Sequence, residues 1–477
     1  MYKSSIYLII TLFTVFSCKT SSEAEKNLVN NLPKNYGVTT ESTPLILPER
    51  SVFFNDSVLS SLINKSLEKN FDVQSALQRV QQYRAEVILN KGIRLPDLSF
   101  NGSIGQRQFG KYTMDGVGNY DTNFSPNITE NQKISNPLPD YYLGLQSQWE
   151  IDIWGKLKNK KKAAMARFLA SENGKNLVIT NVIAEVANLY YEILALDTEK
   201  HIVEDNIKLQ EEALEIVIIQ KQVGRANELG IEIMQGRLLS SKAKLIEVDQ
   251  RIVIAQNQIN FLLGRYPEAI TIKNDILKQP LPLKISEGIP SEMLAKRPDI
   301  KQAEFELTAT KSDVKSAKAA FYPSLNINAA MGFHAFNAAL LLENPASTAY
   351  QVFGGLTAPL LNRRVLKAQL LSSKTAQQQA YINYEKTVVN GFKEVYNSIY
   401  QLASAQKMTD LKSEEVRTFK NSITTSRELF KSGKANYLEI VNSQKNYLDS
   451  QLELVNLKKQ QLQSTVNLYK SLGGGLQ

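Results

Sequence analysis

Few side chains in this 477-residue sequence are placed to do covalent or metal chemistry. The chain has one cysteine, Cys18, and two histidines, His201 and His334, which lie far apart in the sequence. We find no metal-ligand cluster, no nucleophile elbow and no phosphate-binding loop in the sequence. We therefore expect no enzyme activity, no metal site and no cofactor.

Cys18 is the one residue placed for a covalent modification. Lys3 provides a short positive segment, Ile6 to Phe16 is almost continuously apolar, and Cys18 follows Val15-Phe16-Ser17 directly. This arrangement resembles a bacterial lipobox, in which the cysteine is acylated, for example with palmitate, and becomes the new N-terminus after cleavage. Val15 in place of leucine and the bulky Phe16 depart from the commonest box. A plain secretory signal with an incidental cysteine is the alternative.

The bulk composition excludes several classes of protein. With 43% hydrophobic and 22% charged residues the chain should fold, and its formal net charge of +9 comes from basic residues spread along the sequence. No dense basic patch with interleaved aromatics is present, so we expect no nucleic-acid partner. Beyond the N-terminus no run of 18 apolar residues occurs, so a membrane span would have to be a β-barrel.

An internal duplication organises the chain. At a constant offset of 227, residues 72–102 align with residues 299–329, and at an offset of 209, residues 185–264 align with residues 394–473. The smaller second offset places 18 extra residues in the first copy. They belong to the Gly, Asn and Tyr-rich stretch between Gly105 and Tyr141, which we interpret as a long exposed loop.

Each copy is predicted to contain a helix, two strands and a long helical hairpin. In the first copy, apolar residues at helical spacing predict a helix over Ser57 to Lys91, closed by Pro96. From Tyr141 to Ile153, and again from Leu325 to Phe333, apolar and polar residues alternate with the period of a strand. An apolar outer face and a polar inner face suit a membrane barrel around water, whereas one such strand alone would equally suit a soluble sheet.

The predicted hairpins are too long for a compact domain. From about Lys156 to Val223, apolar residues recur every three to four positions without a proline, which corresponds to a helix of roughly 100 Å. Residues 224–227 then reverse the chain into a second helix that ends at Leu263-Gly264, and residues 432–436 do the same in the second copy. A lone coiled-coil stalk would also have such a hairpin, but it leaves the four strands unexplained.

Three short blocks carry a family resemblance. They are Phe53-Phe54-Asn55-Asp56, Arg297-Pro298-Asp299 with the residues after it, and Phe321-Tyr322-Pro323-Ser324-Leu325 leading into a strand. Together they resemble the lipoprotein branch of the TolC-like family, the OprM-like and NodT-like channels, over nearly all of the mature chain. The resemblance implies an α+β membrane protein, a TolC-like tunnel in which each protomer gives four β-strands to a trimeric 12-stranded β-barrel, continued by a long periplasmic α-helical barrel.

The strand count agrees with an oligomer. Four strands cannot close a barrel, since about eight is the practical minimum, and open edges are not tolerated in lipid. Two chains would give 8 strands and three would give 12, and only the larger number leaves a useful aqueous lumen. The family implies the trimer.

The sequence divides into six segments on this interpretation. They are a lipoprotein signal peptide at 1–17, a lipid-anchored segment at 18–56, a first TolC-like repeat at 57–264, a linker that contributes to an equatorial belt at 265–296, a second repeat at 297–473 and a C-terminal tail at 474–477.

The implied function is that of a passive exit duct. The resemblance places the chain in the outer membrane, lipid-anchored and extending into the periplasm, as the channel of a tripartite efflux system for small molecules such as drugs, toxic compounds or metal ions. Its implied partners are two further copies of itself, a periplasmic adaptor (membrane fusion protein), an inner-membrane pump and outer-membrane lipid. The alternatives are the channel of a protein-secretion exporter and a structural lipoprotein stalk without a pore.

The resemblance also implies candidate sites at the turns of the two hairpins. The residues expected to contact the adaptor and close the entrance are Gly224, Arg225, Asn227, Gly433, Lys434 and Asn436. Six residues beyond the turn glycine the family often carries an acidic residue that rings the lumen as a constriction. Glu439 has this position in the second copy, whereas the first has Gly230, with Glu228 and Glu232 as possible substitutes. Solvent-facing surface charges are the alternative for these glutamates and for Arg225 and Lys434.

Overall fold

The computed structural model describes residue 33 and residues 48–224, 226–272, 275–281, 290–361 and 363–474, apart from the side chain of Met293. Cys18 and Arg225 lie outside the described residues. The chain folds into two compact units. One contains the residues up to Leu77, Asn173–Gln302 and the chain from Tyr384 onward, and the other contains Gln78–Glu172 and Ala303–Asn383. Each sequence repeat contributes to both units.

The first helical region is broken in two. After the short α3 (Arg50–Phe53), the chain forms α4 (Ser57–Lys69) and α5 (Phe71–Gly92). The prediction of one helix over Ser57 to Lys91 was wrong, because Asn70 ends α4 and its side-chain oxygen accepts the N–H groups of Asp72 and Val73 to begin α5. The end at Gly92 lies one residue beyond the predicted Lys91 and before Pro96.

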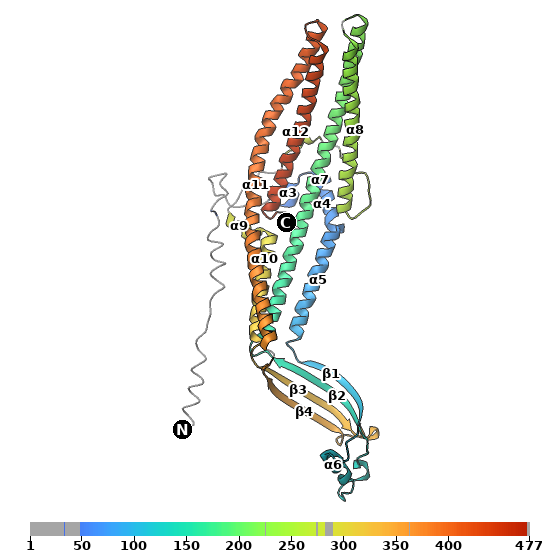
Figure 1. The fold of residues 1–477 in the computed structure, drawn as a ribbon, viewed down its shortest axis with the longest axis vertical. Coiled ribbons are helices and arrows are strands. Elements are labelled where there is room, and N and C mark those ends of the chain that lie inside the picture. Colours follow the sequence, from blue (N-terminus) through green and yellow to red (C-terminus); the bar gives the residue numbers. More distant parts are fainter. Residues whose placement is uncertain are drawn as a thin grey trace. The chain divides into compact units, whose positions relative to one another are not determined.

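The four predicted strands are confirmed and form one antiparallel sheet in the order β1-β2-β3-β4 (Figure 1). The sheet contains β1 (Asp97–Arg107), β2 (Leu138–Ile151), β3 (Ser324–Ala335) and β4 (Thr348–Thr357). Strand β2 therefore ends two residues before the predicted Ile153. The connection between β1 and β2, which was expected to be a plain loop, contains α6 (Met114–Thr122) and a 3₁₀ turn (Glu130–Gln132), and a second 3₁₀ turn (Ala338–Leu340) joins β3 to β4.

The two long hairpins are also confirmed. They are α7 (Lys156–Gln222) with α8 (Glu228–Leu262), and α11 (Arg363–Lys431) with α12 (Tyr437–Ser471). Between them lie a 3₁₀ turn (Ile276–Lys278), α9 (Pro290–Lys296) and α10 (Pro298–Ala319). Both bounds of α8 and α12 differ by 209, and both bounds of α5 and α10 by 227. The offsets found by sequence comparison are thus the structural register of the duplication.

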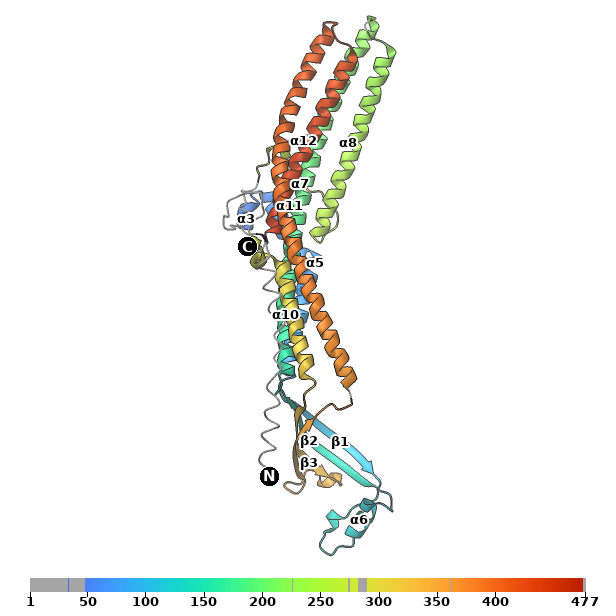
Figure 2. The ribbon, with the colours of Figure 1, turned by 60° about the vertical axis from the view of Figure 1, so that its left-hand side comes forward.

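The hairpin helices lie side by side in the order α8, α7, α12, α11 (Figures 1 and 2). Ion pairs join each neighbouring pair, from Lys242 of α8 to Glu211 of α7, from Lys459 of α12 to Glu192 of α7, and from Lys412 of α11 to Glu453 of α12. Helices α8 and α11 are therefore the outer members of the row, and among the described residues each has one flank without a neighbouring hairpin helix.

Each repeat is closed by the same hydrogen bond, made by different side chains. The Asn70 side chain donates to the carbonyl of Leu262, the last residue of α8, at 3.0 Å, and Arg297 donates to the carbonyl of Ser471, the last residue of α12, at 2.7 Å. Donor and acceptor differ between copies by 227 and 209. These bonds satisfy helix-end carbonyls that would otherwise be buried without a partner.

A glycine follows each of these helix ends because no other residue fits. Gly264 and Gly473 have φ of +63° and +88°, a conformation that L-residues rarely adopt. A Cβ at Gly264 would also overlap the backbone carbonyl of Lys69, and one at Gly473 would overlap that of Lys296. The chain therefore passes directly over the C-terminal end of a short helix at both places, α4 in the first repeat and α9 in the second.

Arg297 makes more polar interactions than Asn70, its equivalent in the first repeat. Its guanidinium is bidentate to Asp299 at 3.0 and 2.7 Å and also contacts Glu394 of α11 at 2.7 Å, while its side chain is only 7% exposed. Burial lowers the pKa of Arg297, but the hydrogen bonds and charges of Asp299 and Glu394 outweigh this, and the net shift is upward. The motif that carried the family resemblance thus joins α10, α11 and α12.

A hydrophobic cluster joins the two hairpins close to their turns. Its buried members are Ala213, Val217, Ile231, Met234, Phe430, Ile440 and Val441, and Tyr437 packs against them. The ring of Tyr437 lies over Gly230, where a Cβ would approach it to 3.1 Å. Gly230 aligns with Glu439, so the departure noted in the first repeat has a packing reason: the ring needs the space.

By length and composition α7 could cross a membrane, but 56% of its most apolar window is buried inside the fold. Core helices of soluble proteins have the same property, so this observation gives little support to a membrane-spanning helix.

We predict that Arg297→Ala destabilises the protein by about 3–5 kcal/mol, because it leaves the carboxylates of Asp299 and Glu394 without their cationic partner and removes a donor to the Ser471 carbonyl. Asn70→Ala should cost about 1–3 kcal/mol, since only neutral hydrogen bonds are lost. Urea unfolding of the detergent-solubilised protein, followed by circular dichroism, measures both. Arg417→Ala is the matched control, because Arg417 makes an exposed pair with Glu414. Equal stability of the Arg297 and Arg417 variants would contradict this account.

We predict that Gly230→Glu, which copies the residue of the second repeat, weakens the packing of the hairpins by about 1–3 kcal/mol, because the side chain must displace the Tyr437 ring. Gly236→Glu in the same helix is the control, since a Cβ at Gly236 meets nothing within 4 Å and the change improves helix propensity. Hydrogen exchange of residues 428–443 reports the local stability. The prediction fails if both variants protect this segment equally.

Candidate functional site

The sheet has one apolar and one polar face. The pairing register places Phe100 opposite Leu145, Leu145 opposite Met331 and Met331 opposite Tyr350, so one row of apolar side chains crosses all four strands. The same face carries Leu98, Ile104, Tyr141, Leu143, Trp149, Ile327, Phe333, Val352 and Leu356. The alternation predicted from the sequence thus extends over the whole sheet.

The opposite face is mainly polar and hydrogen-bonded within itself. Asn101 donates to Gln146 at 2.7 Å across β1 and β2, and His334 lies 2.6 Å from Asp140 across β3 and β2. Tyr142 and Phe353 are the aromatic exceptions on this face, and the Tyr142 ring lies beside His334. A face of this composition suits contact with water.

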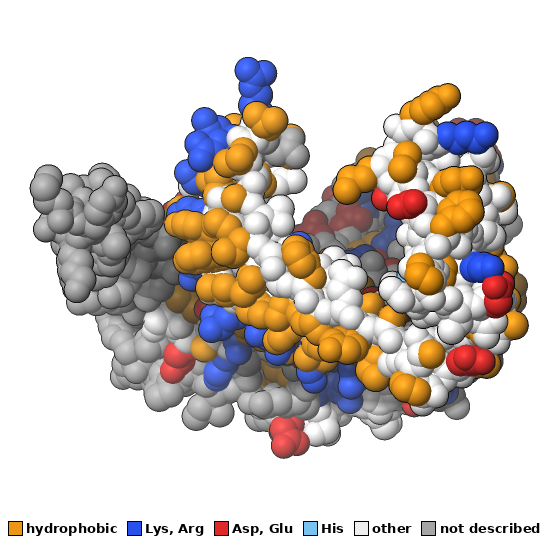
Figure 3. Space-filling view, turned by 90° about the horizontal axis from the view of Figure 1, so that it is seen from below, with side chains coloured by type: hydrophobic (Ala, Val, Ile, Leu, Met, Phe, Trp, Pro, Cys, Tyr) orange, Lys and Arg blue, Asp and Glu red, His pale blue; other side chains and the backbone are white. Residues whose placement is uncertain are grey.

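The apolar face is not covered by any part of the chain that the structure describes. Ile104 is 83% exposed, Tyr350 81% and Val352 73%. Figure 3 shows hydrophobic side chains gathered in a band at this end of the chain. Exposed apolar surface of this extent marks a contact with a partner or with lipid.

Aromatic side chains mark both ends of the apolar face. Tyr141 of β2 lies at the end far from the helices, and Trp149 of the same strand lies near the other end, where its indole N–H donates to the carbonyl of Arg94 at 3.0 Å. Tyr141 and Trp149 are eight residues apart in β2, which is about 26 Å along a strand. This matches the roughly 25 Å apolar band of membrane barrels, flanked by aromatic girdles.

The two hairpin turns have nearly the same backbone geometry. Gly224 and Gly433 both have φ of +73°, and a Cβ at either would meet nothing within 4 Å. Glycine is therefore required here by backbone conformation and not by crowding. Both turns are exposed, so their surfaces are available for contact.

Asn227 and Asn436 begin the second helix of each hairpin. The Asn227 side chain accepts the N–H of Gly230, and that of Asn436 accepts the N–H of Leu438. In the second copy, the carboxylate of Glu439 also accepts the backbone N–H of Asn436 at 2.6 Å, which completes a capping box. Glu439 therefore has a structural role that sequence reasoning missed, although the spacing Asn-x-x-Glu is a recognisable signature.

The other charged candidates lie on exposed surface near the turns. Glu228 forms an ion pair with Lys221 across the first turn, and Glu232 is exposed on α8. Lys434 is exposed, and its backbone N–H donates to the carbonyl of Leu429. The structure thus brings Glu228 and Glu232 close to the first turn and Glu439 and Lys434 close to the second.

Sequence reasoning also missed two apolar stripes on the outer helices. On α8 the exposed residues Leu239, Ile246 and Val253 recur every seven positions, which places them on one side of the helix. On α11 the exposed residues include Val389, Tyr396, Tyr400 and Leu411. Because a hairpin helix already packs on the inner flank of α8 and of α11, these stripes are free for another chain.

Metal chemistry has no support in the described part of the chain. Over these residues no group of three or more His, Cys, Asp or Glu side chains is placed to hold a metal ion. Burial is the main cause of two shifted pKa values. Burial and then the charge of Asp56 raise the pKa of Tyr191, and burial lowers the pKa of Lys458.

Comparison with known proteins agrees with this geometry. The family model described as "Outer membrane efflux protein" matches residues 62–265 and 289–474. The cation efflux system protein CusC of Escherichia coli K12 is 26% identical over 426 residues, covering 89% of this chain and 88% of that protein. The probable outer membrane lipoprotein SilC of Salmonella typhimurium is 24% identical and covers 100% of this chain and 99% of its own.

Solved structures give the same fold. A membrane protein from Pseudomonas aeruginosa superimposes with a TM-score of 0.81 at 21% identity, covering 91% of this chain and 99% of its own, and the outer-membrane channel OprN reaches 0.80 at 22% identity, covering 93% and 98%. These are TolC-like channels, with a strand region and long helical hairpins. The family match, the duplicated hairpins and the two-faced sheet lead to one conclusion: the chain belongs to the outer membrane efflux protein family and is the outer-membrane component of an efflux system.

Proposed function

We propose that three copies of this chain form a passive duct through the outer membrane, through which a pump in the inner membrane, connected by a periplasmic adaptor, expels small molecules. The observation that carries the proposal is the four-stranded sheet, whose apolar face is exposed and whose edge strands β1 and β4 are unpaired over the described residues. Three sheets joined edge to edge satisfy both requirements at once, with lipid against the apolar face and water against the polar one.

The hairpins support the same assembly. If β4 of one copy pairs with β1 of the next, α11 of the first copy lies beside the outer flank of α8 of the second. The apolar stripes on these helices, represented by Leu411 and Ile246, would then cover each other. Twelve long helices would close a tunnel in the periplasm, and Cys18, when acylated, would anchor each copy in the inner leaflet. The residues of segments 18–56 and 265–296 would surround the tunnel.

The turns would be the gate and the adaptor contact. Gly224, Asn227, Gly433, Lys434 and Asn436 lie at the exposed ends of the hairpins, and Arg225, outside the described residues, is proposed to act with them. Where these ends converge, Glu439, with Glu228 and Glu232 as first-repeat counterparts, would supply a ring of negative charge that attracts cations. Glu439 can do this while capping α12, because a carboxylate has a second oxygen.

No reaction is part of this proposal, since conduction needs only a polar passage. A channel for a protein-secretion exporter would use the same duct and differ in its inner-membrane partner, so co-purification of that partner separates the two. A stalk without a pore would not need a sheet with two different faces.

We predict that cysteines at Leu95 and Leu361 form a disulfide between neighbouring copies. Leu361 follows β4 and is 98% exposed, and Leu95 precedes β1 and is also exposed. Inside the chain, the equivalent turns already meet, because Trp154 after β2 donates to the carbonyl of Pro323 before β3 at 2.7 Å. Oxidation should give covalent dimers and trimers on a denaturing gel.

The disulfide cannot form within one copy. Strands β1 and β4 are separated by two others, so their edges lie at least about 14 Å apart, beyond disulfide reach. Leu95→Cys combined with Leu342→Cys is the control, since Leu342 lies in the loop at the opposite end of β4 and should not cross-link. Monomers only, from the Leu95 and Leu361 pair, would refute the proposed order of copies.

We predict cation-selective conductance steps when the purified protein is placed in a planar bilayer. Glu439→Gln should lower the cation-to-anion permeability ratio severalfold without loss of stability, because glutamine keeps an oxygen that can accept the N–H of Asn436. Glu439→Ala should change both properties. Glu414→Gln, which alters an exposed glutamate on α11, should change neither.

The absence of conductance from the wild type and from variants with substituted turn residues, such as Lys434→Asp, would exclude the duct. Conductance with unchanged selectivity in Glu439→Gln would retain the duct and exclude the ring of charge at this residue.

A further inference from the structure

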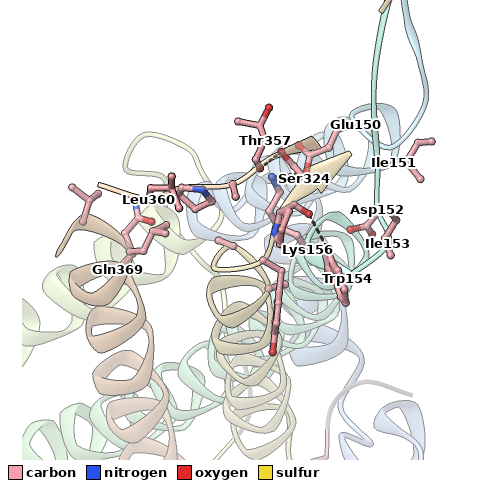
Figure 4. Close-up of a pocket in the computed structure, with 18 of the residues that line it drawn as sticks. Glu150, Ile151, Asp152, Ile153, Trp154, Lys156, Ser324, Thr357, Leu360 and Gln369 are labelled. Carbon is pink, nitrogen blue, oxygen red and sulfur yellow. Dashed lines mark hydrogen bonds and ion pairs between the residues drawn. The ribbon is translucent and has the colours of Figure 1, made fainter. Parts of the chain in front are cut away.

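A cavity of about 730 Å³ lies where the sheet meets the helices (Figure 4). The ends of β2, β3 and β4 line it, together with the starts of α7 and α11 and the end of α10. Its size falls within the range of small-molecule sites in proteins.

Three of the four strand residues that line the cavity lie on the polar side of the sheet. They are Glu150, Ser324 and Thr357, which alternate in their strands with Trp149, Leu325 and Leu356 of the apolar face, and the fourth is Ile151 of the apolar face. In the trimer proposed above, the polar side faces the lumen. A solute in the duct could therefore reach the cavity.

Most of the lining is apolar or aromatic. Trp154 and Tyr322 stack with their ring centroids 4.9 Å apart, and both are about half exposed. Leu360, Val365, Leu366, Pro323, Pro359, Ala319 and Ala320 add aliphatic surface, whereas Leu361, at the rim, is the residue placed above at the contact between copies. An organic molecule would bury apolar area against these residues.

The charged groups of the lining favour a cation. Glu150 and Asp152 carry negative charge and Lys156 positive charge, so the lining has a net charge of −1. The carboxylate of Asp152 is occupied by the backbone N–H groups of Leu157 and Lys158 at the start of α7. Glu150 is paired at 2.5 Å with Lys156, a flexible side chain that a ligand ammonium could replace. Aromatic faces also attract cations.

We infer that this cavity is a binding site for amphiphilic organic cations in transit, with the apolar body against Trp154, Leu360 and Val365 and the charged group at Glu150. The inference rests on the proposed duct, because it needs the polar face of the sheet to line the passage. It assigns to the wall of the channel a resting site for solutes.

The test uses the full-length trimer in lipid nanodiscs and the fluorescent cation rhodamine 6G. Fluorescence polarisation should show saturable binding, and fluorescein, an anionic dye of similar size, should not bind. Glu150→Gln should weaken binding by about tenfold, because it removes the carboxylate that pairs with the cation. Val365→Phe should change the binding constant, because it alters the apolar surface against which the body of the cation packs. Val365 is half exposed, so the larger side chain is compatible with folding, and heat-resistant trimers on a gel check this.

The location is tested with tryptophan, because the chain has only Trp149 and Trp154. In the Trp149→Phe variant, rhodamine 6G should protect Trp154 from acrylamide quenching. In the Trp154→Phe variant it should leave Trp149, on the apolar face, unprotected. Equal protection of both tryptophans, or binding unchanged by Glu150→Gln and Val365→Phe, would show simple partition into lipid and overturn the inference. Conductance and cross-linking of the same preparation test the duct separately, so a working channel without saturable binding would refute the site alone.

Discussion

The outward-facing N–H and C=O groups along β1 and β4 need hydrogen-bond partners wherever the sheet meets hydrocarbon, since water cannot supply them there. The part of the chain that the structure describes contains four strands in linear order, and none of it pairs with the outer edges of β1 and β4. Two other features agree with pairing of these edges to other chains. The apolar face runs to both edges, and the outer helices α8 and α11 carry apolar stripes on the flanks that lack an intrachain neighbour.

The duplication explains why the turns next to the edge strands β4 and β1 resemble the turns next to the inner strands β2 and β3. Within the chain, the turn after β2 meets the turn before β3, with Trp154 bonded to the carbonyl of Pro323. The turn after β4 is the second-repeat equivalent of the turn after β2. The turn before β1 is the first-repeat equivalent of the turn before β3. In the proposed ring this contact would occur twice, once inside the chain and once between copies. The contact between copies would bring together Leu361 and Leu95, two exposed apolar side chains.

The sequence predicted the elements of this fold well and their local chemistry less well. Offsets of 227 and 209 reproduced the bounds of the paired helices because aligned repeats must share a register. The break at Asn70 was missed because apolar spacing continues through it, and only its side-chain bonds to Asp72 and Val73 reveal two helices. Helix α6 was missed because its Gly and Asn content is typical of loops. The apolar stripes of α8 and α11 could not be separated from core positions without knowing each helix's neighbours.

The two hairpin turns share one backbone conformation but differ in the side chain at one equivalent position. Both turns need glycine at φ +73° and an asparagine cap, yet at the next equivalent position the second copy has Glu439, which completes the cap, and the first has Gly230, which admits Tyr437. One repeat therefore gains a charge and the other gains the space that lets the hairpins pack together. Because Tyr437 belongs to the helix that Glu439 caps, the two differences act on one element. A ring built from three such chains would have six similar turns but only three carboxylates at this position, so the charge at its entrance would have threefold and not sixfold symmetry.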